Sequence, residues 1–203
     1  MPCRNETEQS ILDAAIALFG NRGRNAVSIA EIANTAGVNR ALIFYYFGSK
    51  DGLYRAAFLS LFEEFAGTVA SKILPIEPGI GKVERLVREH IAYIRSHPAL
   101  VRFIVRELLQ ADNSVLLPEI ITIMGPFRDM MLEALIEGTA NGEIRDVDLR
   151  QTMVNVLSLS VFFFLGKPLI RLFLDDINLT RFEREREDHV IDLLMHGLKT
   201  QGV

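Results

Sequence analysis

Apolar residues recur every three or four positions along almost the whole chain, which is the spacing of one face of an α-helix. Two such rows run along residues 8–22: Ile11, Ala15, Leu18 and Leu12, Ile16, Phe19. No segment has the strict apolar–polar alternation of a half-buried strand. The pattern therefore predicts an all-α fold.

The helix after this first one has the clearest start signal. Ser28 and Glu31 have the spacing of a capping box, in which each side chain bonds the other residue's backbone N–H. The helix is expected to end at Gly37, and Asn39 can cap a third, short helix that runs to about Phe47. Two short helices joined by a glycine turn form a helix-turn-helix, whose second helix fits a DNA major groove.

Further helices are predicted over residues 49–74, 83–97, 98 onward, 118–140, 148–166 and 183–198. Pro126 predicts a kink in the fourth of these. The helix over 148–166 is apolar nearly all round, so two of its faces need a cover. Its apolar run over 153–166 is shorter than a membrane span, which favours a buried helix. The charged run over 181–189 is expected to be a solvated helix start.

The run SIAEIANTAGVNRALIFYYFGSKDGL (Ser28–Leu53) resembles the signature of the TetR (tetracycline-repressor, AcrR-type) family, and ILDAAIALFGNRG (Ile11–Gly23) resembles the family's first helix. The resemblance implies a helix-turn-helix DNA-binding domain over 1–54 and a helical effector-binding and dimerisation domain over 55–203. It also implies a ligand-responsive regulator, a repressor that binds palindromic operator DNA as a homodimer and is released by a small apolar or aromatic effector.

The resemblance implies eight DNA-binding residues: Ser28, Arg40, Ala41, Leu42, Phe44, Tyr45, Tyr46 and Lys50. Ser28 and Lys50 fall at phosphate-contacting positions, and Arg40 falls at a base-facing one. Leu42 and Phe44 lack the hydroxyl groups common in the family, so they can contact thymine methyls but cannot donate hydrogen bonds. Arg40 is therefore the leading candidate for direct readout of guanine.

Composition and charge change this picture little. The net charge of −4 argues weakly against a nucleic-acid partner, but residues 1–55 carry six Lys/Arg against five acids, or +1, so any basic footprint must be local. Residues 44–47 are all aromatic, and neighbours on a helix are about 100° apart, so Phe44 or Tyr45 must be exposed. The single cysteine, Cys3, and the polar first ten residues predict a reducing, cytoplasmic location.

Apolar and polar residues of the middle helices predict an effector site, formed by His90, Tyr93, Phe103, Glu107, Met124, Phe127, Met131 and Leu157. His90 lies on an apolar stripe, where an ordinary core histidine is favoured slightly over a ligand contact. The methionines around Pro126 fit packing and a pocket equally. Glu107 can pair with Arg102, Arg106 or solvent instead of a ligand.

A lone helix-turn-helix reads few base pairs, so useful affinity needs two copies on one duplex. The helices over 148–166 and 183–198 are the predicted means of pairing two chains in a four-helix arrangement. The predicted dimer contacts are Met153, Val156, Ser160, Phe163, Phe164, Val190 and Leu194.

The usual enzyme motifs are missing from the sequence: there is no phosphate-binding loop, dinucleotide loop, GxSxG or HExxH. His189 and His196 share a helix face without a carboxylate or cysteine constellation, so no metal site and no cofactor are predicted. The alternative to a regulator is a helical interaction module or ligand-binding protein without sequence-specific DNA binding. In that case replacing Arg40 and Tyr45 would not change the affinity of the protein for DNA.

Overall fold

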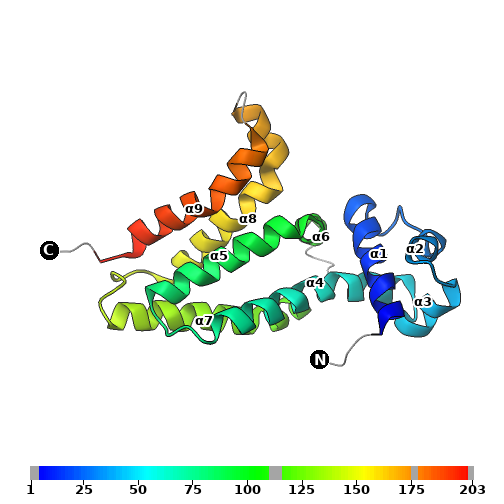
Figure 1. Cartoon of the computed structure of the whole chain (residues 1–203), viewed down its shortest axis with the longest axis horizontal. Helices are drawn as coiled ribbons and strands as arrows, with labels where there is room; N and C mark the ends of the chain where they lie inside the picture. The colour runs from blue at the N-terminus through cyan, green and yellow to red at the C-terminus, as the bar shows by residue number, and fades with distance from the viewer. Residues whose placement is uncertain (1–4, 110–115, 175–177, 201–203) are drawn as a thin grey trace. The chain divides into compact units, whose positions relative to one another are not determined.

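The computed structural model of the chain describes residues 5–109, 116–174 and 178–200, so Cys3 lies outside the described part. These residues confirm the predicted all-α fold, with one isolated backbone bridge between Ile144 and Lys199 (Figure 1). The helices are α1 (Glu6–Arg22), α2 (Ile29–Ala36), α3 (Arg40–Phe47), α4 (Lys50–Ile73), α5 (Ile80–Ser96), α6 (Pro98–Leu108), α7 (Leu117–Ala140), α8 (Leu149–Phe173) and α9 (Leu179–Leu198).

The capping signals in the sequence place the first helices correctly. The Ser28 hydroxyl accepts from the Glu31 backbone N–H at 3.2 Å, and the Glu31 carboxylate accepts from the Ser28 N–H at 2.8 Å. That backbone bond, together with the Arg22 guanidinium, lowers the pKa of Glu31 to about 2. Gly37 ends α2 in the left-handed conformation, at φ 68°.

The later helices are longer than the apolar periodicity predicts. α8 continues seven residues past Gly166, to Phe173, and α9 begins at Leu179 because the Asn178 side chain accepts from the Arg181 N–H at 3.0 Å. The structure also changes the comparison of the apolar part of α8 with the length of a membrane span. Residues Leu149–Lys167 are long and apolar enough to cross a membrane by length and composition alone, and 28 % of that stretch is buried in the chain. The argument from insufficient length was therefore wrong.

The described residues form two compact units. One contains the residues up to Glu64 together with His97–Ile123, and the other contains Phe65–Ser96 and the residues from Met124 onward. We call them the N-terminal and the C-terminal unit. α6 therefore belongs with α1–α3, although the sequence division at residue 54 separates it from them.

The core of the N-terminal unit is built on α1. Its buried side chains meet those of α2, α3, α4 and α6; the fully buried members are Ile11, Leu12, Ala15, Phe19, Ile32, Ile43, Leu53, Ala57, Phe58 and Phe103. The Tyr54 ring joins them, with its centroid 5.3 Å from those of Phe19 and Phe103. This packing fixes the helix-turn-helix to α4 and α6.

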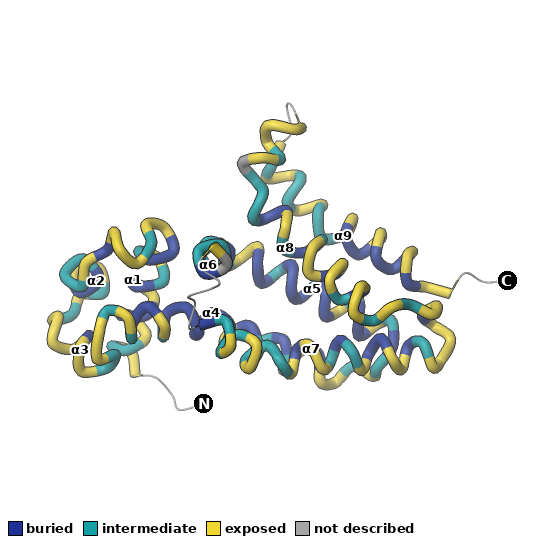
Figure 2. The backbone as a smooth tube through the Cα atoms, turned by 180° about the vertical axis from the view of Figure 1, so that it is seen from behind, coloured by how far each residue is buried: buried dark blue, intermediate teal, exposed yellow. Residues whose placement is uncertain are grey.

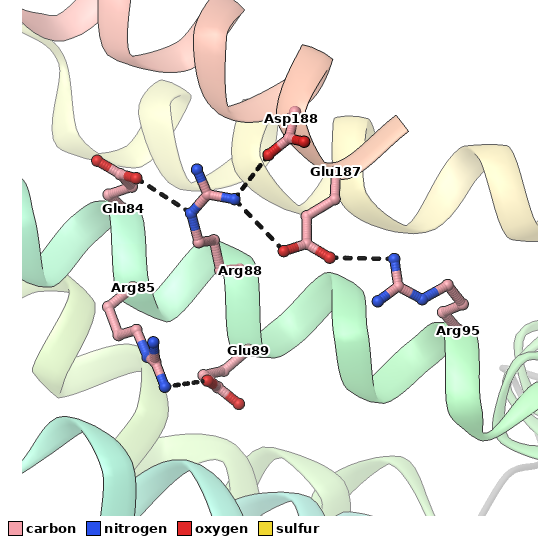
Figure 3. A network of polar contacts seen from close by, with 7 residues as sticks. All are labelled: Glu84, Arg85, Arg88, Glu89, Arg95, Glu187 and Asp188. Atoms are coloured by element: carbon pink, nitrogen blue, oxygen red, sulfur yellow. Dashed lines mark hydrogen bonds and ion pairs between the residues drawn. The ribbon is translucent and has the colours of Figure 1, made fainter. Parts of the chain in front are cut away.

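In the C-terminal unit, α8 and α9 pack on α5, whose inner face is buried along most of its length (Figure 2). Charged residues tie α9 to α5: Arg88 pairs with Asp188 at 2.9 Å, and Arg95 pairs with Glu187 at 3.0 Å (Figure 3). Arg88 also pairs with Glu84 of its own helix at 3.0 Å. The charged run over 181–189 is thus partly a packing surface, which corrects the expectation of a solvated helix start.

The Ser28 cap gives a first prediction. Ser28→Ala removes one partner of the box and should destabilise the N-terminal unit by about 1 kcal/mol, which lowers the melting temperature by about 2–4 °C in a chain of this size. Thermal unfolding followed by circular dichroism measures this. Ser71→Ala is the control, because Ser71 is exposed and bonds only to the Thr68 carbonyl within α4. Equal melting of both variants and the unmodified chain would contradict the role of the cap.

Candidate DNA-binding site and effector region

The short helix α3 presents most of the predicted DNA-binding residues to solvent. The Asn39 side chain caps it by accepting from the Ala41 N–H at 2.9 Å, and Ile43 anchors it in the core. Because neighbouring side chains on a helix point in different directions, this anchor leaves the other faces of α3 outside. The exposed predicted residues are Ser28, Arg40, Ala41, Leu42, Phe44 and Tyr45.

The aromatic run divides as its helical geometry requires. Phe44 is 50 % exposed and Tyr45 is 79 % exposed, whereas Tyr46 and Phe47 are half-buried. The Tyr46 hydroxyl accepts from the Asn5 side-chain amide at 2.8 Å, and the same Asn5 caps α1 by accepting from the Glu8 N–H. Sequence reasoning missed Asn5, although an Asn three residues before a Glu at a helix start is a recognisable cap.

Some of the cationic side chains in α1–α4 are used in ion pairs within the chain, and others are not. Arg22 pairs with Glu31 at 2.8 Å and Arg24 pairs with Asp51 at 3.1 Å. Within the part of the chain that the structure describes, neither Arg40 nor Lys50 has an acidic partner. The positive charge offered to an anionic partner is therefore concentrated at α3 and the start of α4.

Four of the predicted effector residues are buried in the C-terminal unit: His90, Tyr93, Phe127 and Met131. The Phe65 ring joins three of them, with its centroid 5.5 Å from that of His90, 5.1 Å from Tyr93 and 5.2 Å from Phe127. We call Phe65, His90, Tyr93 and Phe127 the aromatic cluster. Its members come from α4, α5 and α7, and Met124 is half-buried in α7. Sequence reasoning missed Phe65, which lies on the apolar face of α4.

His90 is the unusual member of the aromatic cluster. Its Nδ1 is buried and has no hydrogen-bond partner among the described residues. Burial lowers the pKa of His90 to about 4, so the imidazole is neutral near pH 7. A neutral imidazole carries one donor and one acceptor nitrogen, and an unpartnered buried nitrogen is costly.

Three further predicted effector residues have other surroundings within their own units. Phe103 and Glu107 belong to the N-terminal unit. There Phe103 packs against Phe58, and the Glu107 carboxylate accepts from the Tyr54 hydroxyl at 3.0 Å. Burial, with the Glu107 charge, raises the pKa of Tyr54. Leu157 is 44 % exposed on α8. The packing within either unit therefore does not bring all eight predicted effector residues to one site.

The predicted dimer residues face inward within the chain. Val156, Ser160, Phe163, Phe164, Val190 and Leu194 are buried, and Met153 is half-buried. The exposed apolar side chains of α8 and α9 are different ones: Val154, Leu157, Phe162, Leu169, Leu172, Phe173 and Leu193. We call these seven the exposed stripe. Apolar residues lie on nearly every face of α8, so the apolar period alone could not show which row the chain covers itself.

Two family models match the stretches of the chain that hold these sites. Residues 11–57 match the model of the bacterial regulatory proteins, tetR family, and residues 80–194 match that of the tetracyclin repressor-like C-terminal domain. The second match alone spans more than half of the chain. The chain belongs to the TetR family.

Relatives and solved structures agree with this membership. The chain is 25 % identical over 202 residues to the HTH-type transcriptional repressor NicS of Pseudomonas putida, covering 96 % of this chain and 93 % of NicS. It is 28 % identical over 167 residues to the "Probable HTH-type transcriptional regulator YttP" of Bacillus subtilis, covering 81 % of this chain and 80 % of YttP.

Two solved structures show the same fold at low identity. FadR from Bacillus subtilis, in complex with stearoyl-CoA, has a TM-score of 0.72 at 21 % identity and covers 93 % of this chain and 98 % of FadR. The ketosteroid regulator KstR2 of Mycobacterium tuberculosis has a TM-score of 0.74 at 18 % identity and covers 98 % of each chain.

The two TetR-family matches divide the candidate sites between them. All eight predicted DNA-binding residues lie within residues 11–57, together with the Ser28 cap and the exposed face of α3. His90, Tyr93 and Phe127 of the aromatic cluster and the whole exposed stripe lie within residues 80–194. This TetR-family chain is therefore a transcriptional regulator in which the DNA-binding and effector candidates occupy separate stretches.

The buried imidazole predicts a specific pH dependence. Between pH 6.5 and pH 4 the unfolded chain protonates His90 while the folded chain does not, so stability falls as the pH falls through this window. The difference between the two pKa values corresponds to on the order of 3 kcal/mol. His90→Phe should remove this part of the pH dependence, measured as urea unfolding at pH 7 and pH 4.5.

His189→Ala is the matched control, because His189 is exposed on α9. It should follow the unmodified chain at both pH values. If His90→Phe lost as much stability between pH 7 and pH 4.5 as the unmodified chain, a neutral buried His90 would be ruled out.

Proposed function

We propose that this chain is a repressor that binds palindromic operator DNA as a homodimer and is released when a small apolar or aromatic effector binds its C-terminal domain. The observation that carries the proposal is the exposed face of α3, with Arg40, Phe44 and Tyr45 outward on a helix anchored by Ile43. It acts in the cytoplasm and catalyses no reaction, in keeping with relatives that are named as regulators.

Contacts of two kinds would hold the operator. Arg40 can form a bidentate pair with guanine in the major groove, which discriminates bases by about 1–3 kcal/mol. Phe44 and Tyr45 offer apolar surface to thymine methyls and sugars. Ser28 and Lys50 contact phosphates, which fix the position of the protein without reading sequence.

The effector would bind at the aromatic cluster. Aromatic walls suit an apolar ligand, and the unpartnered His90 nitrogen suits one polar group on it. FadR, which has the same fold, is bound to stearoyl-CoA in its structure, so the fold admits a ligand that carries a long apolar chain. Release requires the effector to bind one dimer arrangement more tightly than the other. The favoured arrangement would move the two recognition helices off their groove spacing.

A second copy of this chain would cover the exposed stripe. Seven large apolar side chains exposed on two helices that pack together are more than the scattered single ones normal for a surface, and such groups mark interaction sites. Asn155 and Ser158 are also exposed on α8, and such polar groups are tolerated better in a partly hydrated protein interface than in lipid. The dimer would supply the second helix-turn-helix that a palindromic operator needs.

Operator binding is tested by fluorescence anisotropy, with DNA from upstream of the chain's own gene and random DNA, at several salt concentrations. We expect tight, salt-dependent binding to one fragment. Arg40→Ala and Tyr45→Ala should each weaken it about ten-fold or more, while Arg181→Ala, an exposed arginine of α9, should not. Adding apolar and aromatic small molecules to the same titration tests release.

Equal weak binding to every fragment, unchanged by Arg40→Ala and Tyr45→Ala, would support the interaction-module alternative instead. If operator binding is specific but no added molecule reverses it, the repressor hypothesis would stand and release by an apolar effector would be refuted.

The dimer is tested by sedimentation equilibrium at micromolar concentration. The unmodified chain should sediment as a dimer, and Phe162→Glu with Leu169→Glu should sediment as a folded monomer, because two buried unpaired carboxylates strongly disfavour an interface. Leu74→Glu is the control, since Leu74 is at least as exposed as Phe162 and Leu169 but follows α4, outside the exposed stripe. A monomeric unmodified chain, or a double variant that stays dimeric, would refute this interface.

A further inference from the structure

The C-terminal end of α1 is held by two arginines of α6. A helix end leaves its last four backbone carbonyls without partners. Arg102 Nε donates to the Gly20 carbonyl at 2.9 Å. Arg106 Nη1 donates to the Phe19 carbonyl at 2.9 Å and to the Gly20 carbonyl at 2.8 Å, and its Nη2 donates to the Asn21 carbonyl at 3.2 Å.

α1 does not close this end by itself in the usual way. Gly23, its C-cap, has φ 81° and ψ 163°, which is not the left-handed cap conformation. Its N–H bonds only the Phe19 carbonyl, at 2.8 Å. The two guanidinium groups therefore supply most of the remaining partners, and their positive charge suits the negative end of the helix dipole.

α1 and α6 also approach closely at this point. A side-chain Cβ built at Gly20 would lie 3.0 Å from the Ala99 Cβ and 3.7 Å from the Phe103 ring. Glycine at this position leaves the space that the two backbones need. The arginine bonds and the glycine contact are independent features of the same junction.

α1 in turn carries the helices that meet DNA. Its Ser10 hydroxyl donates to the Ala36 carbonyl at the end of α2, and its last residue, Arg22, pairs with Glu31 near the start of α2. Its N-cap, Asn5, bonds Tyr46 of α3. Any displacement of α1 against α6 would therefore carry α2 and α3 with it.

We propose that Arg102 and Arg106 are positioning residues for operator binding, which hold α1 on α6 and so fix the orientation of α3. The proposal rests on the proposed function, in that α3 is taken to read the operator. α6 follows α5 with only His97 between them, and α5 carries His90. The junction is thus one place where the chain leads from α5 to the helices that support α3.

The first test compares the full-length chain with Arg102→Gln/Arg106→Gln and with Arg128→Gln, an exposed arginine of α7 paired with its neighbour Asp129. Hydrogen exchange should show at least ten-fold faster exchange of amides in α1–α3, including the Gly23 N–H, in the double variant only. Amides of α5, α8 and α9 should keep their protection. Arg102→Lys/Arg106→Lys should be intermediate, because an ammonium keeps the charge but lacks the planar fork.

The second test measures operator affinity at several salt concentrations. The double glutamine variant should bind about ten-fold more weakly with an unchanged slope of log K against log salt, because neither arginine contacts phosphate. Lys50→Gln should lower that slope by about 1. Gly20→Val, which keeps both arginines but crowds Ala99, should weaken binding and α1–α3 protection in the same direction.

Three outcomes would overturn the proposal: unchanged exchange and affinity, a slope reduced by about 2 in the double glutamine variant, which indicates direct phosphate contact, or equal loss of protection in both units. If the unmodified chain bound no fragment specifically, the proposed function would fail and the positioning role with it. The exchange experiment would still decide whether α6 holds α1.

Discussion

Burial of the apolar face of α1 is the interaction on which the DNA-binding end of this protein depends. Ile11, Leu12 and Phe19 are completely buried, and each such side chain stabilises the folded state by about 1.5–3 kcal/mol. The same face contacts α2 and supports the packing of α3, α4 and α6. An isolated helix as short as α3 is marginal in water. Its orientation is therefore a property of α1 and its partners, with Ile43 as the single fully buried anchor.

The sequence predicted the local structure of this end well because each boundary there is set by neighbouring residues. Ser28 with Glu31, Gly37 and Asn39 each act over two or three positions, and the structure confirms every one of these caps. The exposure of Tyr45 followed from helical geometry and one inward neighbour. Asn5 was missed for a different reason, because its second contact, to Tyr46, joins residues 41 positions apart.

The sequence could not predict which of several apolar rows the chain covers itself. In α8 apolar residues lie on nearly every face, so choosing Phe162 over Val156 as an outward residue required knowledge of where α5 and α9 lie. Polar partners were equally hard to assign. Glu107 was matched with Arg102, Arg106 or solvent, yet those arginines donate to the carbonyls of α1, and the carboxylate accepts from the Tyr54 hydroxyl. Competition between a carboxylate and several carbonyls for one guanidinium is decided by tertiary geometry.

Within the described residues, a single chain leaves the exposed stripe uncovered and the His90 nitrogen without a partner, and α5 links these two features within the C-terminal unit. The exposed stripe lies on α8 and α9, which both pack on α5, and α9 is also tied to α5 through Arg88 and Arg95. The unpartnered nitrogen of His90 lies on α5 itself. If a second chain covers the stripe and a small molecule meets His90, both act on one helix. Thermodynamic linkage then requires that each changes the affinity for the other by the same factor. Effector binding and the arrangement of the dimer are therefore expected to be coupled through α5, without a contact between the effector and the second chain.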